Sequence, residues 1–176
     1  MQVSRREFVT TAVSAAAVAA VAAQALINDA APAPKGDPMT TTLTPYLLFD
    51  GTCQQAMEFY RACFGGELSA TKVKDSPIKD HMPAAQQEKV LNAHLKHGNL
   101  KISASDWLAP NGIPRRGNTV CLYLSGGTYE ELKTFFDKLA NGAEVTDPLK
   151  EQFFGTYGAL NDKFGVRWMF QTSNKS

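Results

Sequence analysis

Two segments of the chain share a pattern of apolar and polar positions that predicts a capped amphipathic helix. Each begins with a capping-box pair, Thr52 with Gln55 and Thr128 with Glu131, and each ends at glycine. Apolar residues recur at i, i+3, i+4 and i+7 in both segments: Ala56, Phe59, Tyr60 and Cys63 in the first, and Leu132, Phe135, Phe136 and Leu139 in the second. The two segments align without a gap, which indicates an internal repeat.

Strand-like stretches surround both predicted helices in the same order, with one before each helix and three after it. The expected strands are 46–49, 67–72, 89–97 and 100–105 in the first half, and 120–124, 143–145, 155–160 and 166–171 in the second half. Chance similarity of two amphipathic helices is the alternative. Because the two segments share their capping pairs, their apolar faces and the glycines that end them, we favour a duplicated α+β fold of two βαβββ modules.

The first 38 residues have the pattern of an export signal and a linker rather than of a folded element. Ser4–Val9 resembles the twin-arginine export motif of bacteria, and the uncharged run Ala12–Ala23 leads to a small-x-small cleavage site at Ala23–Ala25. Spanning a bilayer takes about 20 apolar residues, so we expect no stable membrane span here. Asn28–Pro38 is rich in Ala and Pro and is typical of a linker.

We therefore expect residues 1–38 to be a signal peptide and linker, residues 39–176 to be the folded domain, and the mature protein to be periplasmic. Two alternatives remain open: an amphipathic or disordered tail, and a cytoplasmic protein if translation starts at Met39. Twin-arginine substrates fold in the reducing cytoplasm, so the three cysteines are expected to be free thiols.

Composition narrows the function classes further. The 18 basic and 17 acidic residues give a net charge of +1, which argues against a general nucleic-acid or membrane-surface binder. Hydrophobic residues make up 44% and charged residues 20%, as in ordinary globular domains.

The repeat resembles the vicinal oxygen chelate superfamily, which includes glyoxalase I, extradiol dioxygenases and antibiotic-resistance proteins, and within it the PhnB-like branch. The matching pieces are 44–51, 56–60, 64–66, 94–95, 105–107 and 162–168. The resemblance spans about Thr42 to Gln171. It implies a curved mixed-sheet cup with the helices on its outer face, a small-molecule ligand in the cup, and a homodimer.

In the metal-dependent relatives, His and Glu ligands project from the first and last strand of each module. The corresponding stretches here are 44–49, 100–105, 119–124 and 166–171, and none of their positions is His, Asp or Glu. Divalent cations need oxygen or imidazole ligands. We therefore expect neither the standard metal site nor another cofactor.

His94 lies in the interior of the predicted strand 89–97, whereas His97 ends that strand at a turn. Period-2 alternation places Leu91, Ala93 and Leu95 against the helix, so Asn92 and His94 would face the cup. A solvated strand face is the alternative. The candidate ligand-binding residues are Tyr46, Asn92, His94, Ser103, Tyr123, Phe154 and Trp168, although core packing is the first interpretation for Trp168.

Two functions follow from these residues. The first is a small-molecule binding protein without the standard metal. The second is a glyoxalase-like or other lyase or isomerase that uses His94 as a general acid or base. A dimeric interaction module with an empty cup is a third option. The identity of the ligand is beyond the sequence.

Overall fold

The computed structural model describes residues 41–109, 112, 115, 117 and 119–173. The predicted signal peptide and linker lie outside the described residues. The described elements belong to one compact unit, Thr40–Ser176. Among the described residues, no helix is long and apolar enough to cross a membrane.

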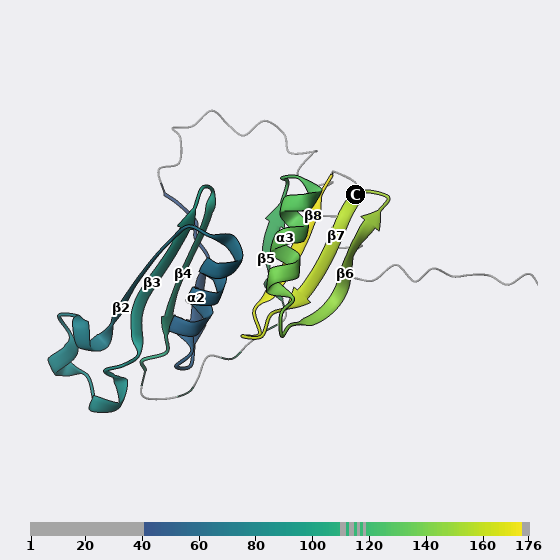
Figure 1. Ribbon diagram of the computed structural model, residues 1–176. Coiled ribbons are helices and arrows are strands. Elements are labelled where there is room, and N and C mark those ends of the chain that lie inside the picture. Colours follow the sequence, from purple (N-terminus) through teal and green to yellow (C-terminus); the bar gives the residue numbers. More distant parts are fainter. Residues whose placement is uncertain (1–40, 110–111, 113–114, 116, 118, 174–176) are drawn as a thin grey trace, which may run out of the picture. The chain divides into compact units, whose positions relative to one another are not determined.

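The described chain forms two modules with the same order of elements (Figure 1). The first module comprises β1 (Tyr46–Phe49), α2 (Cys53–Phe64), β2 (Glu67–Lys72), β3 (Val90–His97) and β4 (Leu100–Asp106). The second comprises β5 (Leu122–Ser125), α3 (Tyr129–Leu139), β6 (Glu144–Gln152), β7 (Gly155–Asn161) and β8 (Arg167–Thr172). The predicted duplication of a βαβββ unit is confirmed.

Each module has a four-stranded mixed sheet, with order β1-β4-β3-β2 in the first and β5-β8-β7-β6 in the second. In each sheet the strand before the helix runs parallel to the last strand, and the other neighbours are antiparallel. The helix is thus the crossover that a parallel pair of strands requires. No hydrogen-bonded pair of described strands closes the sheets into a barrel.

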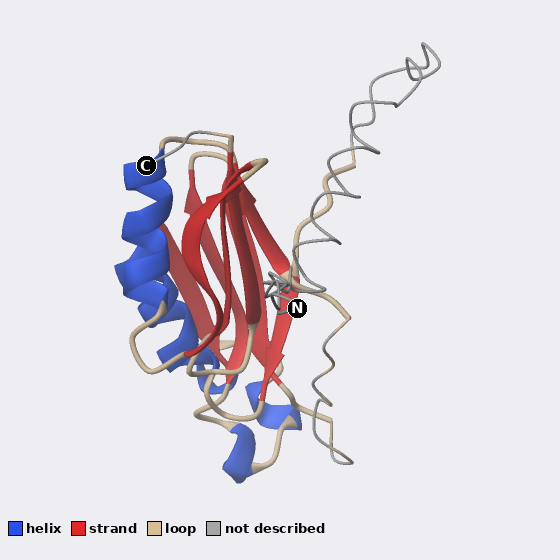
Figure 2. Ribbon diagram, turned by 90° about the vertical axis from the view of Figure 1, so that its right-hand side faces the viewer, coloured by secondary structure: helices blue, strands red, loops and turns tan. Residues whose placement is uncertain are grey.

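Among the described elements, α2 and α3 cover the same side of the strands, and no described helix covers the opposite side (Figure 2). We call this opposite side of each sheet its inner face. The apolar stripes predicted for the helices are the buried ones: the core includes Ala56, Tyr60, Cys63, Leu132, Phe136 and Leu139. Their spacing leaves one apolar face per helix, and that face packs on the sheet.

A carboxylate from β4 caps helix α2. Asp106 Oδ1 accepts a hydrogen bond from the Cys53 N–H at 2.9 Å, and Oδ2 accepts one from the Val90 N–H at 2.8 Å. The predicted capping role of Thr52 is wrong, because its side chain makes no cap hydrogen bond. In α3 the prediction holds, since Thr128 Oγ1 accepts from the Glu131 N–H at 3.1 Å.

A second buried carboxylate, Asp162, joins the two modules. Its Oδ2 accepts from the Tyr60 hydroxyl at 2.7 Å and from Trp168 Nε1 at 2.8 Å. Its Oδ1 accepts from the backbone N–H groups of Phe164 and Val166, each at 2.9 Å. Tyr60 lies on α2 and Asp162 follows β7, so this carboxylate fixes the contact between the halves.

Strand β6 is longer than the sequence predicted. The expected strand stopped at residue 145, but β6 continues through Pro148 to Gln152. The strand lies at the edge of its sheet. Proline is tolerated there because an edge strand has one side without a hydrogen-bonded neighbour.

Candidate functional site

The inner face of the first sheet presents a row of polar side chains across three strands. The register places Tyr46 of β1 beside Ser103 of β4, and Ser103 beside His94 of β3. His94 Nδ1 and Ser103 Oγ are hydrogen-bonded at 2.8 Å. Alternation confirms the predicted faces: Ala93 and Leu95 are buried toward the helix, while Asn92 and His94 are exposed on the inner face. Four of the predicted site residues are therefore neighbours.

The inner face of the second sheet carries a comparable row. The Tyr123 hydroxyl of β5 donates to Gln171 Oε1 of β8 at 2.8 Å, and Gln171 is paired in register with Tyr157 of β7. Sequence reasoning did not single out Gln171 as a site residue. Gln171 lies on the face of its strand opposite Trp168 and Phe170, so strand alternation could have placed it on the same face as Tyr123.

The Tyr157 hydroxyl is the most unusual group on this face. The side chain is 1% exposed, and its oxygen has no hydrogen-bond partner among the described residues. Burial, with the nearby Asp147 carboxylate, raises the pKa of Tyr157 to about 12, so the hydroxyl keeps its proton near neutral pH. The Phe154 ring lies 6.1 Å from the Tyr157 ring. A buried donor of this kind calls for a partner.

Trp168 is located differently from the other candidates. It is 1% exposed, belongs to the core cluster on the helix side, and donates its indole N–H to Asp162. This position agrees with core packing, the first interpretation of Trp168 from its sequence context.

Two clefts lie where β1 and β5 approach each other. One, of about 630 Å³, is lined among others by Pro45, Lys101, Cys121 and Tyr123. The other, of about 270 Å³, is lined among others by Tyr46, Cys121 and Arg167. Residues from both modules line both clefts. The predicted residues Tyr46 and Tyr123 thus open onto space between the two sheets.

The residues present do not fit the metal site implied by the resemblance. On the inner faces, the four strands that would supply ligands carry Tyr46, Leu48, Lys101, Ser103, Ser105, Tyr123, Ser125, Arg167, Met169 and Gln171. None of these is a carboxylate or an imidazole. Asp106 ends β4, but two backbone N–H groups on the helix side occupy its carboxylate. The described residues contain no cluster of three or more His, Cys, Asp or Glu suited to a metal.

Comparison with known proteins identifies close relatives. The model of the family described as 3-demethylubiquinone-9 3-methyltransferase matches residues 41–171. Protein YjdN of Escherichia coli K12 is 30% identical over 140 residues, which are 72% of this chain and 92% of that protein.

Solved structures of similar proteins also match this chain over most of its length. PA1353 from Pseudomonas aeruginosa is 32% identical with a TM-score of 0.65, covering 78% of this chain and 100% of that one. A putative 3-demethylubiquinone-9 3-methyltransferase, PhnB protein, from Bacillus cereus is 26% identical with a TM-score of 0.60, covering 75% and 99%. A glyoxylase/bleomycin resistance protein/dioxygenase domain from Frankia sp. EAN1pec shares the fold, at 17% identity, a TM-score of 0.52, and coverage of 76% and 97%.

Proposed function

The chain belongs to the family described as 3-demethylubiquinone-9 3-methyltransferase, and from this premise we propose that it binds a small molecule on the inner faces of its two sheets. The observation that carries the proposal is the contrast between the two sides of the sheets. The helix side is packed with apolar residues, while the inner faces carry hydrogen-bonding groups in register. Ligand sites of small-molecule binders combine apolar walls with a few placed polar groups.

The polar groups favour a ligand that accepts hydrogen bonds. The Tyr157 hydroxyl is a buried donor, and Gln171 uses its carbonyl oxygen for Tyr123, which leaves its amide N–H₂ available as a donor. In the first sheet, the His94–Ser103 pair holds one ring nitrogen and leaves the other for a ligand. A ligand with carbonyl or other acceptor oxygens matches these groups.

The family is named for a methyltransferase, but the function proposed for this chain does not include methyl transfer. Nucleotide-type methyl donors are commonly held by a G-x-G-x-x-G loop between a strand and a helix. The sequence contains no such motif. Binding without methyl transfer is therefore the function that its residues favour.

A second candidate function rests on the orientation of His94. A hydrogen bond to one ring nitrogen fixes the imidazole plane, which is the usual arrangement for a general acid or base. The Ser103 hydroxyl supplies this bond at 2.8 Å. An isomerase or lyase would use the remaining nitrogen to move a proton on the bound molecule.

Retention of small molecules from a cell extract tests the proposal. The protein is incubated with the small-molecule fraction, desalted and denatured, and the released compounds are identified by mass spectrometry. We expect at least one compound that the native protein retains and that His94→Ala and Tyr123→Phe retain about five- to tenfold less, since a hydrogen bond to a ligand contributes about 1 kcal/mol.

His81→Ala is the matched control, because His81 is exposed in a short 3₁₀ turn away from the sheets. It should retain the compound as the native protein does. Equal retention by all variants, or no retained compound at all, would contradict the proposal. Conversion of the compound by the native protein but not by His94→Ala would favour the second candidate function.

A further inference from the structure

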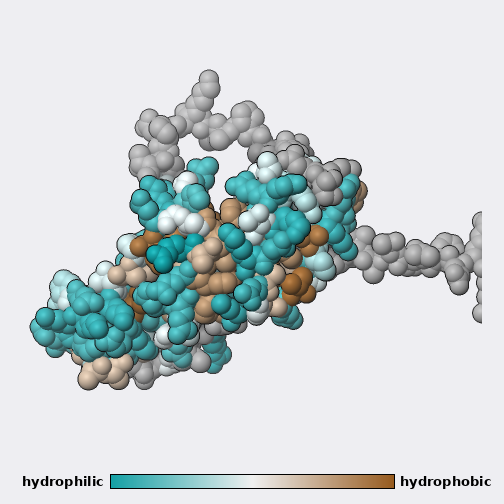
Figure 3. Space-filling view, viewed as in Figure 1, coloured by the Kyte–Doolittle hydropathy of each residue, from teal (hydrophilic) through white to brown (hydrophobic). Residues whose placement is uncertain are grey.

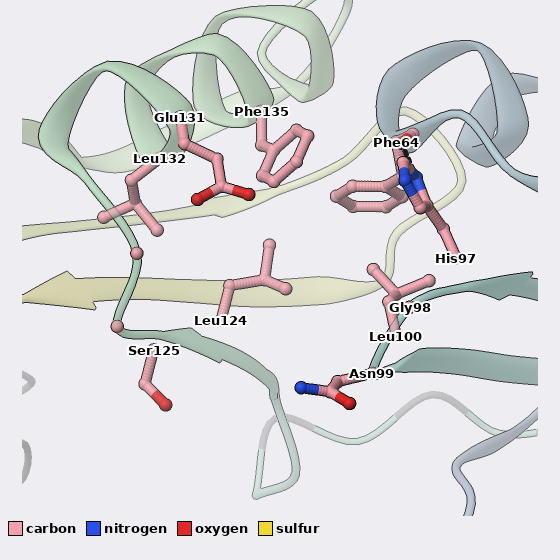
Figure 4. Close-up of a pocket in the computed structure, with 12 residues that line it drawn as sticks. Phe64, His97, Gly98, Asn99, Leu100, Leu124, Ser125, Glu131, Leu132 and Phe135 are labelled. Atoms are coloured by element: carbon pink, nitrogen blue, oxygen red, sulfur yellow. Dashed lines mark hydrogen bonds between the residues drawn. The ribbon is translucent and has the colours of Figure 1, made fainter.

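We propose that a separate cavity, beside the first turns of α3, binds a protonated alkylamine. The cavity has a volume of about 350 Å³ and lies at the junction of the two modules (Figure 4). The last residue of α2 and the β3–β4 turn form one side, and the segment from Leu124 into α3 forms the other. None of the predicted ligand-binding residues lines this cavity, and Ser125 is the one residue that it shares with the inner-face positions named above.

His97 supplies an acceptor to the cavity. Its Nδ1 lies 2.5 Å from the backbone carbonyl oxygen of Phe64. A carbonyl oxygen can only accept, so Nδ1 carries the proton in this bond. In the neutral ring, Nε2 is then an unprotonated acceptor. The hydrogen bond thus fixes the tautomer that a donor ligand needs.

Glu131 supplies the negative charge. In Figure 4 its carboxylate lies between the side chains of Leu132 and Phe135, above Leu124. Glu131 is in the first turn of α3. It forms no ion pair among the described residues.

The glycine at position 127 leaves space for the carboxylate of Glu131. Gly127 has a φ of +70°, and a Cβ at this position would lie 2.5 Å from Glu131 Oε2. A larger residue there would therefore displace the carboxylate. The backbone N–H of Glu131 is already capped by Thr128, so the helix start does not depend on the position of the acid group.

The remaining walls are apolar and suit a short hydrocarbon chain. They are formed by Phe64, Leu100, Leu124, Leu132 and Phe135. The rings of Phe64 and Phe135 meet edge to face, with centroids 5.2 Å apart. Apolar surface gathers in the middle of the face shown in Figure 3, with hydrophilic surface on either side. The cavity is at the lower end of the range for small-molecule pockets, roughly 300–1,000 Å³, which matches a short ligand.

Together these groups specify the chemical class of the ligand. Nε2 of His97, the carboxylate of Glu131, and the oxygens of Asn99 and Ser125 are acceptors around an apolar floor. An ammonium group has three donors and no acceptor, so it complements this set. An anion would meet the Glu131 charge, and a neutral alcohol would leave that charge without a counter-ion.

The test uses hexylamine, with 1-hexanol and hexanoate as neutral and anionic analogues of the same chain length. Binding is followed by amide chemical shifts of the full-length protein at pH 7. Hexylammonium should bind about five- to tenfold more tightly than 1-hexanol, and hexanoate should bind most weakly. The shifts should be largest at Gly98, Gly126 and Gly127, which line the cavity.

Glu131→Gln should remove the preference for the amine over the alcohol, whereas Glu130→Gln should retain it. Glu130 is the matched control, because it lies in the same turn of α3 but does not line the cavity. Equal affinity for amine and alcohol, equal effects of the two variants, or shifts confined to inner-face residues such as Ser103 would each overturn the proposal.

Discussion

At the scale of single residues, two buried carboxylates hold the molecule together without being available for chemistry. Asp106 binds two backbone N–H groups, and Asp162 binds two backbone and two side-chain donors. The four hydrogen bonds to Asp162 fill the acceptor sites of its carboxylate, and Asp106 is buried, with only 4% of its surface exposed. These two buried acids are therefore structural, and the inner-face positions of β1, β4, β5 and β8 carry neutral and basic groups.

Asp162→Ala should be strongly destabilising. The substitution leaves the Tyr60 hydroxyl and the Trp168 indole N–H buried without an acceptor, and each such loss costs about 1–3 kcal/mol. We expect the free energy of unfolding in urea to fall by at least about 3 kcal/mol. Asp80→Ala, at an exposed position in a 3₁₀ turn, should change it by less than about 0.5 kcal/mol. Similar losses in the two variants would contradict the role assigned to Asp162.

The three thiols should differ in reactivity. Burial raises the pKa of Cys53 to about 12 and that of Cys63 to about 11, from an ordinary value of 9.0, while Cys121 is half-buried beside the clefts. Only the thiolate reacts with iodoacetamide. At pH 8, peptide mass spectrometry should therefore find Cys121 alkylated first. Labelling of Cys53 or Cys63 at the same rate would contradict the packing described here.

The same pKa shifts give a pH dependence of stability. The unfolded chain loses these thiol protons near pH 9, and the folded chain retains them to about pH 11 or 12. The folded state therefore binds more protons than the unfolded state in this range, so stability falls as pH rises from about 9 toward 12. Cys53→Ser and Cys63→Ser together should flatten this fall in unfolding measurements, whereas Cys121→Ser should leave it.

At the scale of elements, the two helices begin in different ways although their sequences align. Helix α3 uses its own Thr128, while α2 takes a carboxylate from β4. A side-chain cap within the helix is local, but the cap of α2 exists only when the strand is in place. This difference follows from tertiary structure and not from the aligned residues.

Threonine-to-alanine substitutions test this difference. Thr128→Ala removes a cap hydrogen bond and should cost about 1 kcal/mol of unfolding free energy. Thr52→Ala removes no cap bond and should cost less than about 0.5 kcal/mol. Chemical unfolding of the two variants under the same conditions provides the comparison. A larger loss in Thr52→Ala than in Thr128→Ala would show that the local pattern predicts the cap better than the structure does.

The sequence predicts elements well wherever periodicity is local. The helix stripes and the alternation in β3 follow from spacing alone, because each depends on residues within one element. Strand β6 was predicted to stop at residue 145, and its continuation through Pro148 depends on its position at the sheet edge, which is a tertiary feature. The cavity of His97 and Glu131 could not be predicted, since its walls come from segments far apart in the chain.

At the scale of the whole molecule, exposed apolar residues gather where β1 and β5 approach each other. Leu43, Tyr46, Leu48, Val120 and Tyr123 are all exposed, and all five line the two clefts. Contiguous apolar surface of this kind marks interaction sites on soluble proteins. We propose that a second copy of the chain covers it in a two-fold homodimer.

Sedimentation of two lysine variants tests the dimer. Val120→Lys places a charge in the apolar surface and should shift the protein toward monomer, because an unpaired charge is costly in an interface. Phe153→Lys is the matched control, since Phe153 is also exposed but lies beside the β6–β7 turn. Monomeric native protein, or equal dissociation of both variants, would exclude this surface as the interface.

The central claim is that the inner faces hold a small molecule and not a metal. The most direct measurement is a crystal structure of the protein as purified from its native cells, with X-ray fluorescence recorded from the same crystals. We predict ligand density that contacts the His94–Ser103 pair or the Tyr123–Gln171 pair, without stoichiometric zinc, nickel, iron or manganese. A metal bound between β1, β4, β5 and β8, or ligand density found only away from the inner faces, would contradict the account.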